Sequence, residues 1–340
     1  MKVLIDLINT IGPAGYETLV LQKIKKAIKP YVDTITTDSF GNLICHKKGK
    51  GEKVMIAAHA DEVGLMVKKI DATGFIRITP VGGIEPISLV GQGAIILNRK
   101  NKEACKGIIT FAKLHDAKDV TEVPKMDDLY IDTGISKKEL EKKDIQTGCY
   151  IIPLHHTQFL GNENILMGKA LDDRVGCYIL IETARLLKKM RSKQDIYYVF
   201  TVQEEVGLYG AKTATWNIKP DWGIAIETTL CADSDGEHYL GKGPFLSMKD
   251  TDMISNRCLD DWIQDISKKH KIPLQLEINE FGTTDAKNMM LSRGGIPSTT
   301  LSVPVRNIHS TVGVCHKKDI SSTIEILTSL LKNPPKVCVH

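Results

Sequence analysis

The spacing of apolar residues predicts an α/β chain that opens with helices and continues into short buried strands. Apolar positions recur at helical spacing over residues 17–28, and this helix is expected to end before Pro30. The turn-forming residues 38–42 separate two short extended runs. The continuous apolar run over residues 53–58 is typical of a strand that is buried on both faces.

The pattern changes between about residues 67 and 161, where short apolar runs alternate with Gly, Pro and charged turns. The runs cover residues 75–78, 94–97, 107–111 and 149–152. One short helix is expected over residues 136–144. These features predict a small β-rich domain, residues 68–161, inserted into an α/β domain made of residues 1–67 and 162–340. The alternative is that the same strands extend a single large sheet.

Helix–strand alternation resumes after residue 161 and completes the α/β domain. Helices are expected over residues 173–190 and 319–332, and strands over 195–202, 221–226, 274–278 and 298–303. Asp319 is the expected N-cap of the closing helix, with Pro334 and Pro335 behind it. The predicted fold class is therefore α/β, with a central mixed sheet flanked by helices and interrupted by a small, barrel-like β domain.

Length, composition and the apolar stretches predict a globular protein without a membrane-spanning helix. The 340 residues allow two domains, and 42% hydrophobic with 25% charged residues is ordinary for a globular protein. Apolar stretches such as residues 54–58 are far shorter than the ~20 residues of a membrane helix. The start of the chain lacks the apolar core and cleavage site of a signal peptide, which predicts a cytoplasmic protein.

The charged residues and cysteines argue against two further kinds of binding site. The net charge is only +4 and the basic residues are scattered, so a nucleic-acid partner is not expected. The eight cysteines contain no C-x-x-C pair, which argues against a zinc ribbon or a disulfide framework and predicts reduced thiols.

Candidate chemistry lies where predicted strands end and predicted helices begin, as in many open α/β sheets. His59 and Asp61 follow the strand at residues 53–58, and residues two apart in extended chain share a face. A metal-ligating histidine usually donates its other ring N–H to a carboxylate, which Asp61 could accept. For this pair in isolation, a core histidine beside a loop acid is the commoner explanation.

Two pairs of adjacent acids are harder to explain by structure alone. Helix capping accounts for one of Asp172 and Asp173, which leaves the other available as a ligand. Glu204 and Glu205 end the most apolar strand, where a charge costs several kcal/mol unless it meets a cation. Adjacent residues in extended chain face different ways, so these two glutamates are expected to have different roles.

Three more polar residues complete the candidate set. Glu227 closes the strand at residues 221–226, and His309 follows the strand at residues 298–303. Asp285 begins a predicted helix, where capping and a supporting role in a site remain equally open. Histidines and carboxylates without cysteine suit zinc or a similar divalent ion in a hydrolytic site. A bridging carboxylate with two further ligands per ion would give the paired-metal arrangement of aminopeptidases.

Four segments together resemble the signature segments of the glutamyl aminopeptidase family, a dinuclear-metal group that includes the tetrahedral, dodecameric TET aminopeptidases. The segments are His59-x-Asp61-Glu62-Val-Gly64, Lys169-Ala-Leu-Asp172-Asp173-Arg174, Gln203-Glu204-Glu205-Val-Gly207 and Pro304-Val-Arg306-Asn-Ile-His309-Ser310. They occur in the family's order and span nearly the whole chain. The resemblance implies an α/β metallopeptidase domain with a β-rich insert used in oligomer contacts. Some members of the family have been labelled cellulases or endoglucanases.

The resemblance also implies a role for each candidate residue. His59 and Glu227 would hold one ion, Glu205 and His309 the other, and Asp172 would bridge them. Glu204 would be the general base, and Asp61 would be the carboxylate partner of His59. The chain departs from the family pattern at Glu227, where Asp is common, and at Thr311, where proline is common.

These observations predict a cytosolic aminopeptidase that carries two divalent ions per subunit, most simply zinc or cobalt. A metal-bound hydroxide would attack the peptide bond, with Glu204 as general base. The expected partners are peptide substrates and further copies of the chain, with a dodecamer as the leading expectation by resemblance. One alternative is a glycoside hydrolase, whose paired carboxylates need no metal. The other is a non-catalytic scaffold, which a missing ligand would favour, although none is missing.

Overall fold

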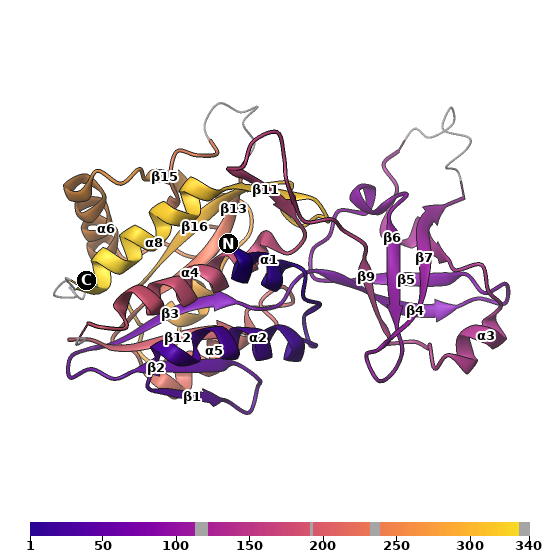
Figure 1. Ribbon diagram of the computed structural model, residues 1–340, viewed down its shortest axis with the longest axis horizontal. Helices are drawn as coiled ribbons and strands as arrows, with labels where there is room; N and C mark the ends of the chain where they lie inside the picture. The colour runs from indigo at the N-terminus through magenta and orange to yellow at the C-terminus, as the bar shows by residue number, and fades with distance from the viewer. Residues whose placement is uncertain (113–121, 191–192, 232–238, 333–340) are drawn as a thin grey trace.

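The structure of the protein is a computed structural model that describes residues 1–112, 122–190, 193–231 and 239–332. It contains an eleven-stranded mixed sheet with helices on both faces and, beside it, a closed six-stranded barrel (Figure 1). The predicted α/β fold with a β-rich insert is confirmed. The barrel strands pair among themselves, so the alternative in which they extend the large sheet is excluded.

The large sheet has the strand order β1-β2-β12-β3-β13-β16-β17-β11-β10, with β14 and β15 branching from β16. Its strands are β1 (Thr34–Thr37), β2 (Leu43–Lys47), β3 (Lys53–His59), β10 (Gln158–Phe159), β11 (Ile165–Gly168), β12 (Asp195–Thr201), β13 (Trp222–Leu230), β14 (Phe245–Lys249), β15 (Gln275–Ile278), β16 (Ser298–Arg306) and β17 (Gly313–His316). The neighbours β12, β3, β13 and β16 are parallel. Their carboxyl ends therefore meet at one edge of the sheet, which is where ligand sites form in such sheets.

Helices cover both faces of this sheet. They are α1 (Lys2–Ile8), α2 (Thr18–Ile28), α4 (Leu171–Leu187), α5 (Tyr209–Ile218), α6 (Arg257–His270), α7 (Asp285–Met290) and α8 (Lys317–Lys332). Apolar side chains of α1, α2, α4, α6 and α8 share one core with the sheet, and those of α5 and α7 form a smaller core on the other face. The central strands are buried on both sides as a result, in line with the continuous apolar run predicted for β3.

The closing helix corrects one prediction. α8 begins at Lys317, so Asp319 lies within its first turn and is not its N-cap. The Asp319 carboxylate instead accepts hydrogen bonds from the backbone N–H groups of Gly241 and Gly243, each at 2.7 Å. It ties α8 to a distant loop, a contact that local sequence rules do not reveal. The prolines at 334 and 335 lie outside the described residues.

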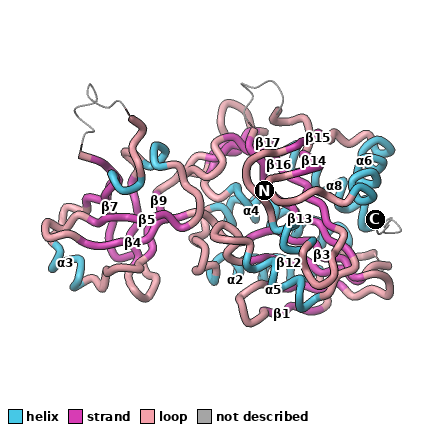
Figure 2. Tube along the Cα trace, turned by 180° about the vertical axis from the view of Figure 1, so that it is seen from behind, coloured by secondary structure: helices cyan, strands magenta, loops and turns pink. Residues whose placement is uncertain are grey.

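The barrel has the strand order β4-β5-β8-β7-β6-β9 and an apolar core of its own. Its elements are β4 (Gly64–Ile70), β5 (Ile76–Val81), β6 (Gly93–Leu97), β7 (Glu103–Phe111), β8 (Leu129–Asp132), α3 (Lys137–Lys142) and β9 (Tyr150–Pro153). Leu65 of β4 pairs with Ile151 of β9, so the chain enters and leaves the barrel through adjacent strands. Figure 2 shows the barrel and the large sheet from behind, joined by these connections.

The cysteines only partly follow the prediction of reduced thiols. Among the described residues, six form no disulfide, namely Cys45, Cys105, Cys149, Cys177, Cys231 and Cys315. Cys258 is disulfide-bonded, so the prediction is wrong at that residue. Cys338 lies outside the described residues.

The helices give one further finding. Among the described residues, none of them combines the length and the apolar character needed to span a bilayer.

Candidate metal centre

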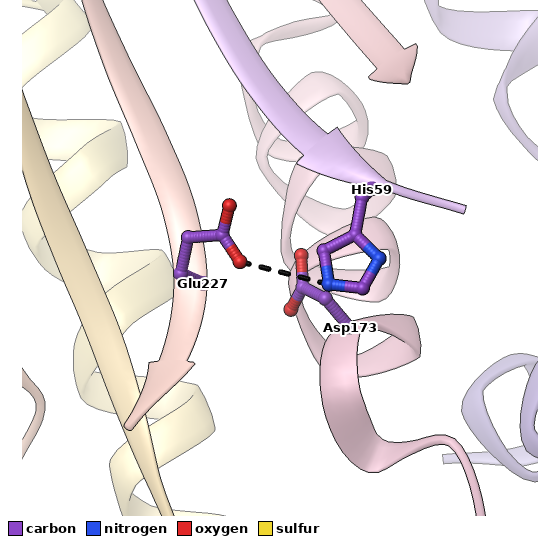
Figure 3. Close-up of side chains that lie close together, drawn as sticks. All are labelled: His59, Asp173 and Glu227. Atoms are coloured by element: carbon purple, nitrogen blue, oxygen red, sulfur yellow. Dashed lines mark ion pairs between the residues drawn. The ribbon is translucent and has the colours of Figure 1, made fainter. Parts of the chain in front are cut away.

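Three neighbouring parallel strands bring polar side chains to the carboxyl edge of the sheet. His59 is the last residue of β3 and pairs with Thr201 at the end of β12. On its other side, Glu227 of β13 points toward it, with Glu227 Oε2 3.7 Å from His59 Nε2 (Figure 3). Both side chains are almost completely buried. The register of parallel strands thus places an imidazole and a carboxylate face to face, although 168 residues separate them in the chain.

Asp172, at the start of α4, lies between two histidines. Its Oδ1 is 3.2 Å from His59 Nε2, and its Oδ2 is 3.4 Å from Nε2 of His309. The Thr228 hydroxyl donates a hydrogen bond of 2.7 Å to Oδ1. On the far side, Glu205 Oε2 is 3.7 Å from His309 Nε2. The carboxylate of Asp172 therefore reaches two adjacent clusters with separate oxygens.

Asp173 has different contacts from its neighbour. It is completely buried, and its Oδ1 accepts a hydrogen bond of 2.8 Å from the backbone N–H of Gly176, three residues further along α4. Figure 3 shows its carboxylate beside His59 and Glu227. His59, Asp173 and Glu227 offer ligand atoms within 4.8 Å of one another, as do His59, Asp172 and Glu205. Asp173 thus bonds to the backbone within α4, whose N-cap is Ala170, and Asp172 is the aspartate of this pair that faces both histidines.

The loop after β12 is held by a buried carboxylate. Asp61 accepts hydrogen bonds of 3.1 Å from the backbone N–H groups of Glu204 and Glu205, one with each oxygen. Its Oδ1 also lies 3.6 Å from His59 Nδ1, just beyond hydrogen-bonding distance. The Glu17 carboxylate accepts a hydrogen bond of 3.2 Å from the backbone N–H of Gln203. The sequence did not predict this contact, because Glu17 lies far from every motif. The side chain of Glu204 then lies with Oε2 3.9 Å from His59 Nε2.

The charges of the site explain the direction of each pKa shift. Burial, reinforced by neighbouring carboxylates, raises the pKa values of Glu204, Glu205 and Glu227 well above their usual range. Burial alone would lower the pKa of His59, but nearby acids, Glu204 first, raise it well above the usual value. For Asp172, hydrogen bonds from His309 and His59 outweigh burial and lower the pKa. The cluster therefore contains more carboxyl groups than its two histidines could neutralise if all the acids were ionised.

Asp285 supports the site by contacts beyond helix capping. The N-cap of α7 is Thr284, and the Asp285 carboxylate accepts a hydrogen bond of 2.6 Å from the Thr201 hydroxyl at the end of β12. The backbone N–H of Asp285 donates to Glu227 Oε1 at 3.4 Å. Of the two explanations left open for Asp285, these contacts favour the supporting one. Burial raises its pKa to about 6.

A buried ion pair beside the site was not recognised from the sequence. Glu62 Oε1 accepts hydrogen bonds from Lys169 Nζ at 2.6 Å and from the Gly12 backbone N–H at 2.8 Å. Burial lowers the pKa of Lys169 to about 8, although Glu62 opposes the shift. Both residues lie within the quoted motifs, next to the candidate ligands. Their position beside the candidate ligands could have indicated that they belong to the site. Through the bond to Gly12 they anchor the N-terminal segment next to the site.

All seven residues predicted for the site lie together at this edge of the sheet, in the contacts described above. They are His59, Asp61, Asp172, Glu204, Glu205, Glu227 and His309. Six come from β3, β13, α4 and the connections after β3 and β12, and His309 comes from the loop between β16 and β17.

Comparison with known proteins gives consistent results. A family model described as M42 glutamyl aminopeptidase matches residues 41–326. The chain is 34% identical to a lysyl aminopeptidase of Pyrococcus furiosus, over 96% of this chain and 95% of the relative. An aminopeptidase structure from the archaeon Desulfurococcus kamchatkensis matches with a TM-score of 0.92 and 33% identity, over 97% of this chain and 93% of that one. The Pyrococcus horikoshii TET1 peptidase, described as assembling into a tetrahedron or a large octahedral shell, matches with a TM-score of 0.88 and 30% identity, over 97% and 98%.

Proposed function

Because the chain belongs to the M42 glutamyl aminopeptidase family and is a peptide hydrolase, we propose that it removes N-terminal residues from peptides with the help of two divalent ions. The observation that carries this proposal is the position of Asp172. Its two oxygens face His59 and His309 separately, at 3.2 and 3.4 Å. A carboxylate with one oxygen for each of two nitrogen donors is suited to bridge two ions.

The proposed ligand sets follow from the two clusters. His59 and Glu227 would hold one ion, Glu205 and His309 the other, with Asp172 common to both. The support is the set of distances from 3.2 to 3.7 Å between the donor atoms, which point toward shared centres. Asp61 would orient His59, since it lies beside the ring nitrogen that faces away from Glu227.

The residues present fit divalent ions on physical grounds. Buried carboxylates without cations are costly, and here several of them lie within a few ångströms of one another. Among the described buried atoms, Glu205 Oε1, Asp173 Oδ2 and Asp285 Oδ1 have no hydrogen-bond partner. Nitrogen and oxygen donors without thiolates suit zinc or cobalt. Such ions, when bound, polarise a carbonyl and lower the pKa of water.

Glu204 is the proposed general base. It is held between the other acids by the hydrogen bond from its backbone N–H to Asp61, and burial raises its pKa. A positioned carboxylate can take a proton from water and return it to the leaving amine. Asp61 acts on this step indirectly, because it positions the backbone of both Glu204 and Glu205.

Removing the ions tests the proposal. We expect a strong chelator to abolish hydrolysis of chromogenic aminoacyl substrates, and zinc or cobalt added back singly to restore it. The physical reason is that buried acids so close together are costly without cations, and no other common role of these acids is described. Full activity in metal-free protein would contradict the proposal and favour a metal-independent glycosidase, tested on oligosaccharides. Inactivity after every reload would favour a scaffold.

We also propose that residues 68–161 form an oligomerisation domain between two catalytic segments, 1–67 and 162–340. Support comes from the separate core of the barrel and from the description of the TET1 peptidase as a self-assembling shell. The chain is expected to elute as a large, symmetric homo-oligomer, with a dodecamer as the first candidate. Light scattering at micromolar concentration measures this directly, and a strict monomer would argue against it. The cytoplasmic location stays a prediction of the sequence.

A further inference from the structure

A loop of the barrel lies against the candidate metal centre. Gly82 and Gly83 follow β5 and precede the 3₁₀-helix Pro86–Leu89. A Cβ atom at Gly83 would lie 3.2 Å from Nδ1 of His309, and one at Gly82 would lie 3.0 Å from Cβ of Glu205. Gly82 of the barrel domain therefore lies against Glu205, and Gly83 against His309, both of the α/β domain.

The approach is too close for any larger residue to fit unchanged. At 3.0–3.2 Å, a Cβ atom would sit inside ordinary van der Waals distance, so either the ring or the loop would have to move. Gly82 also has φ +82°, a conformation that favours glycine. Glycine at these positions lets the backbone itself act as a wall of the site.

His309 has little other support on that side. It lies in a loop with φ 58°, and its side chain is 42% exposed. The Nε2 edge of its ring faces Asp172 and Glu205, so only the Nδ1 edge is left to face Gly83. A half-exposed imidazole can swing away from its partners unless something limits it, and the described contact that limits it there is the glycine loop.

We infer that Gly82 and Gly83 position Glu205 and His309, so that the barrel domain forms part of the active site. This inference rests on the proposed function, in which those two side chains hold one of two ions.

The test is Gly83→Ala, read by calorimetric titration of metal-stripped protein with zinc. We expect one of the two ions to bind ~10–100-fold more weakly, the usual effect of losing support around a metal ligand, while the other keeps its affinity. Gly161→Ala is the matched control, because a Cβ atom at Gly161 would meet no other atom within 4 Å and the residue has no positive φ. Equal zinc affinities in Gly83→Ala and Gly161→Ala would overturn the inference.

A second pair of variants separates contact from backbone strain. Gly82→Ala and Gly91→Ala introduce the same strain, since φ is +82° and +80°, but a Cβ atom at Gly91 would meet nothing within 4 Å. We expect only Gly82→Ala to weaken one ion, and equal effects of the two would count against positioning. The melting temperatures of the metal-free proteins show whether each variant is folded. A large loss of stability in Gly83→Ala alone would also count against a positioning role.

His309→Ala distinguishes the failure of this inference from failure of the proposed function. If it loses one ion while Gly83→Ala binds zinc normally, the ligand assignment stands and the glycine loop has no positioning role. If His309→Ala still binds two ions as tightly as the unmodified protein, the proposed ligand set itself is wrong.

Discussion

Replacing Glu204 by glutamine should lower kcat by ~10²–10⁴-fold, the usual effect of losing a positioned acid–base group, while both ions stay bound. Glutamine keeps the length and polarity of the side chain but cannot take a proton. The backbone N–H that donates to Asp61 is unaffected, so the loop should hold its position. Steady-state kinetics on a chromogenic aminoacyl substrate and metal analysis of the same sample measure the two effects.

Glu205→Gln is the matched control, because it makes the same chemical change one residue further along. Its Oε2 lies 3.7 Å from His309 Nε2, and in the proposed ligand sets Glu205 holds one ion, so we expect this change to weaken that ion. Loss of ions in Glu204→Gln, with retention in Glu205→Gln, would mean that the roles of the two glutamates are exchanged.

Replacing Asp172 by alanine should remove both ions and all measurable peptidase activity. Its two oxygens face His59 and His309 separately, so in the proposed ligand sets Asp172 is the residue common to both ions. Glu227→Ala should release only one ion, because Asp172, Glu205 and His309 would still hold the other. Metal content after dialysis measures the difference.

Asp261→Ala serves as the control for Asp172→Ala. Asp261 is an exposed aspartate of α6 whose described contact is a surface ion pair with Arg257. It should keep two ions per chain. Retention of both ions in Asp172→Ala would refute its role as the bridging ligand.

The sequence predicted best those features that local pattern determines. The apolar run that became β3 and the helical spacing of α2 both appear where expected, because buried strands and amphipathic helices have characteristic periodicities. Two helices of the α/β domain, α5 and α6, were not predicted. α5 lies in a segment rich in threonine with a tryptophan and an asparagine, and its apolar positions are too few to show a clear period.

The same distinction applies to the candidate site, where local pattern predicted some residues and long-range packing determines the others. His59, Glu204, Glu205 and Glu227 could be placed together because each lies at or near the carboxyl end of a strand of a parallel sheet, where the strand ends meet. The strand of Glu227 continues to Leu230, beyond the predicted end at residue 226. Glu17 and the glycine pair at 82–83 could not, because their contacts depend on how distant segments and two domains pack. The N-cap prediction for Asp319 was wrong for a related reason. Such a prediction considers only residues close in sequence, whereas the partners of Asp319 are Gly241 and Gly243.

The continuity of the barrel has a consequence for synthesis on the ribosome. All barrel strands lie between Gly64 and Pro153, so this domain can fold while the rest of the chain is still being made. The large sheet cannot, because β12 inserts between β2 and β3 and must first be translated. From His59 to His309 the ribosome adds 250 residues, which takes about 12–50 s at ~5–20 residues per second. A nascent chain would therefore carry a finished barrel long before it could cleave a peptide.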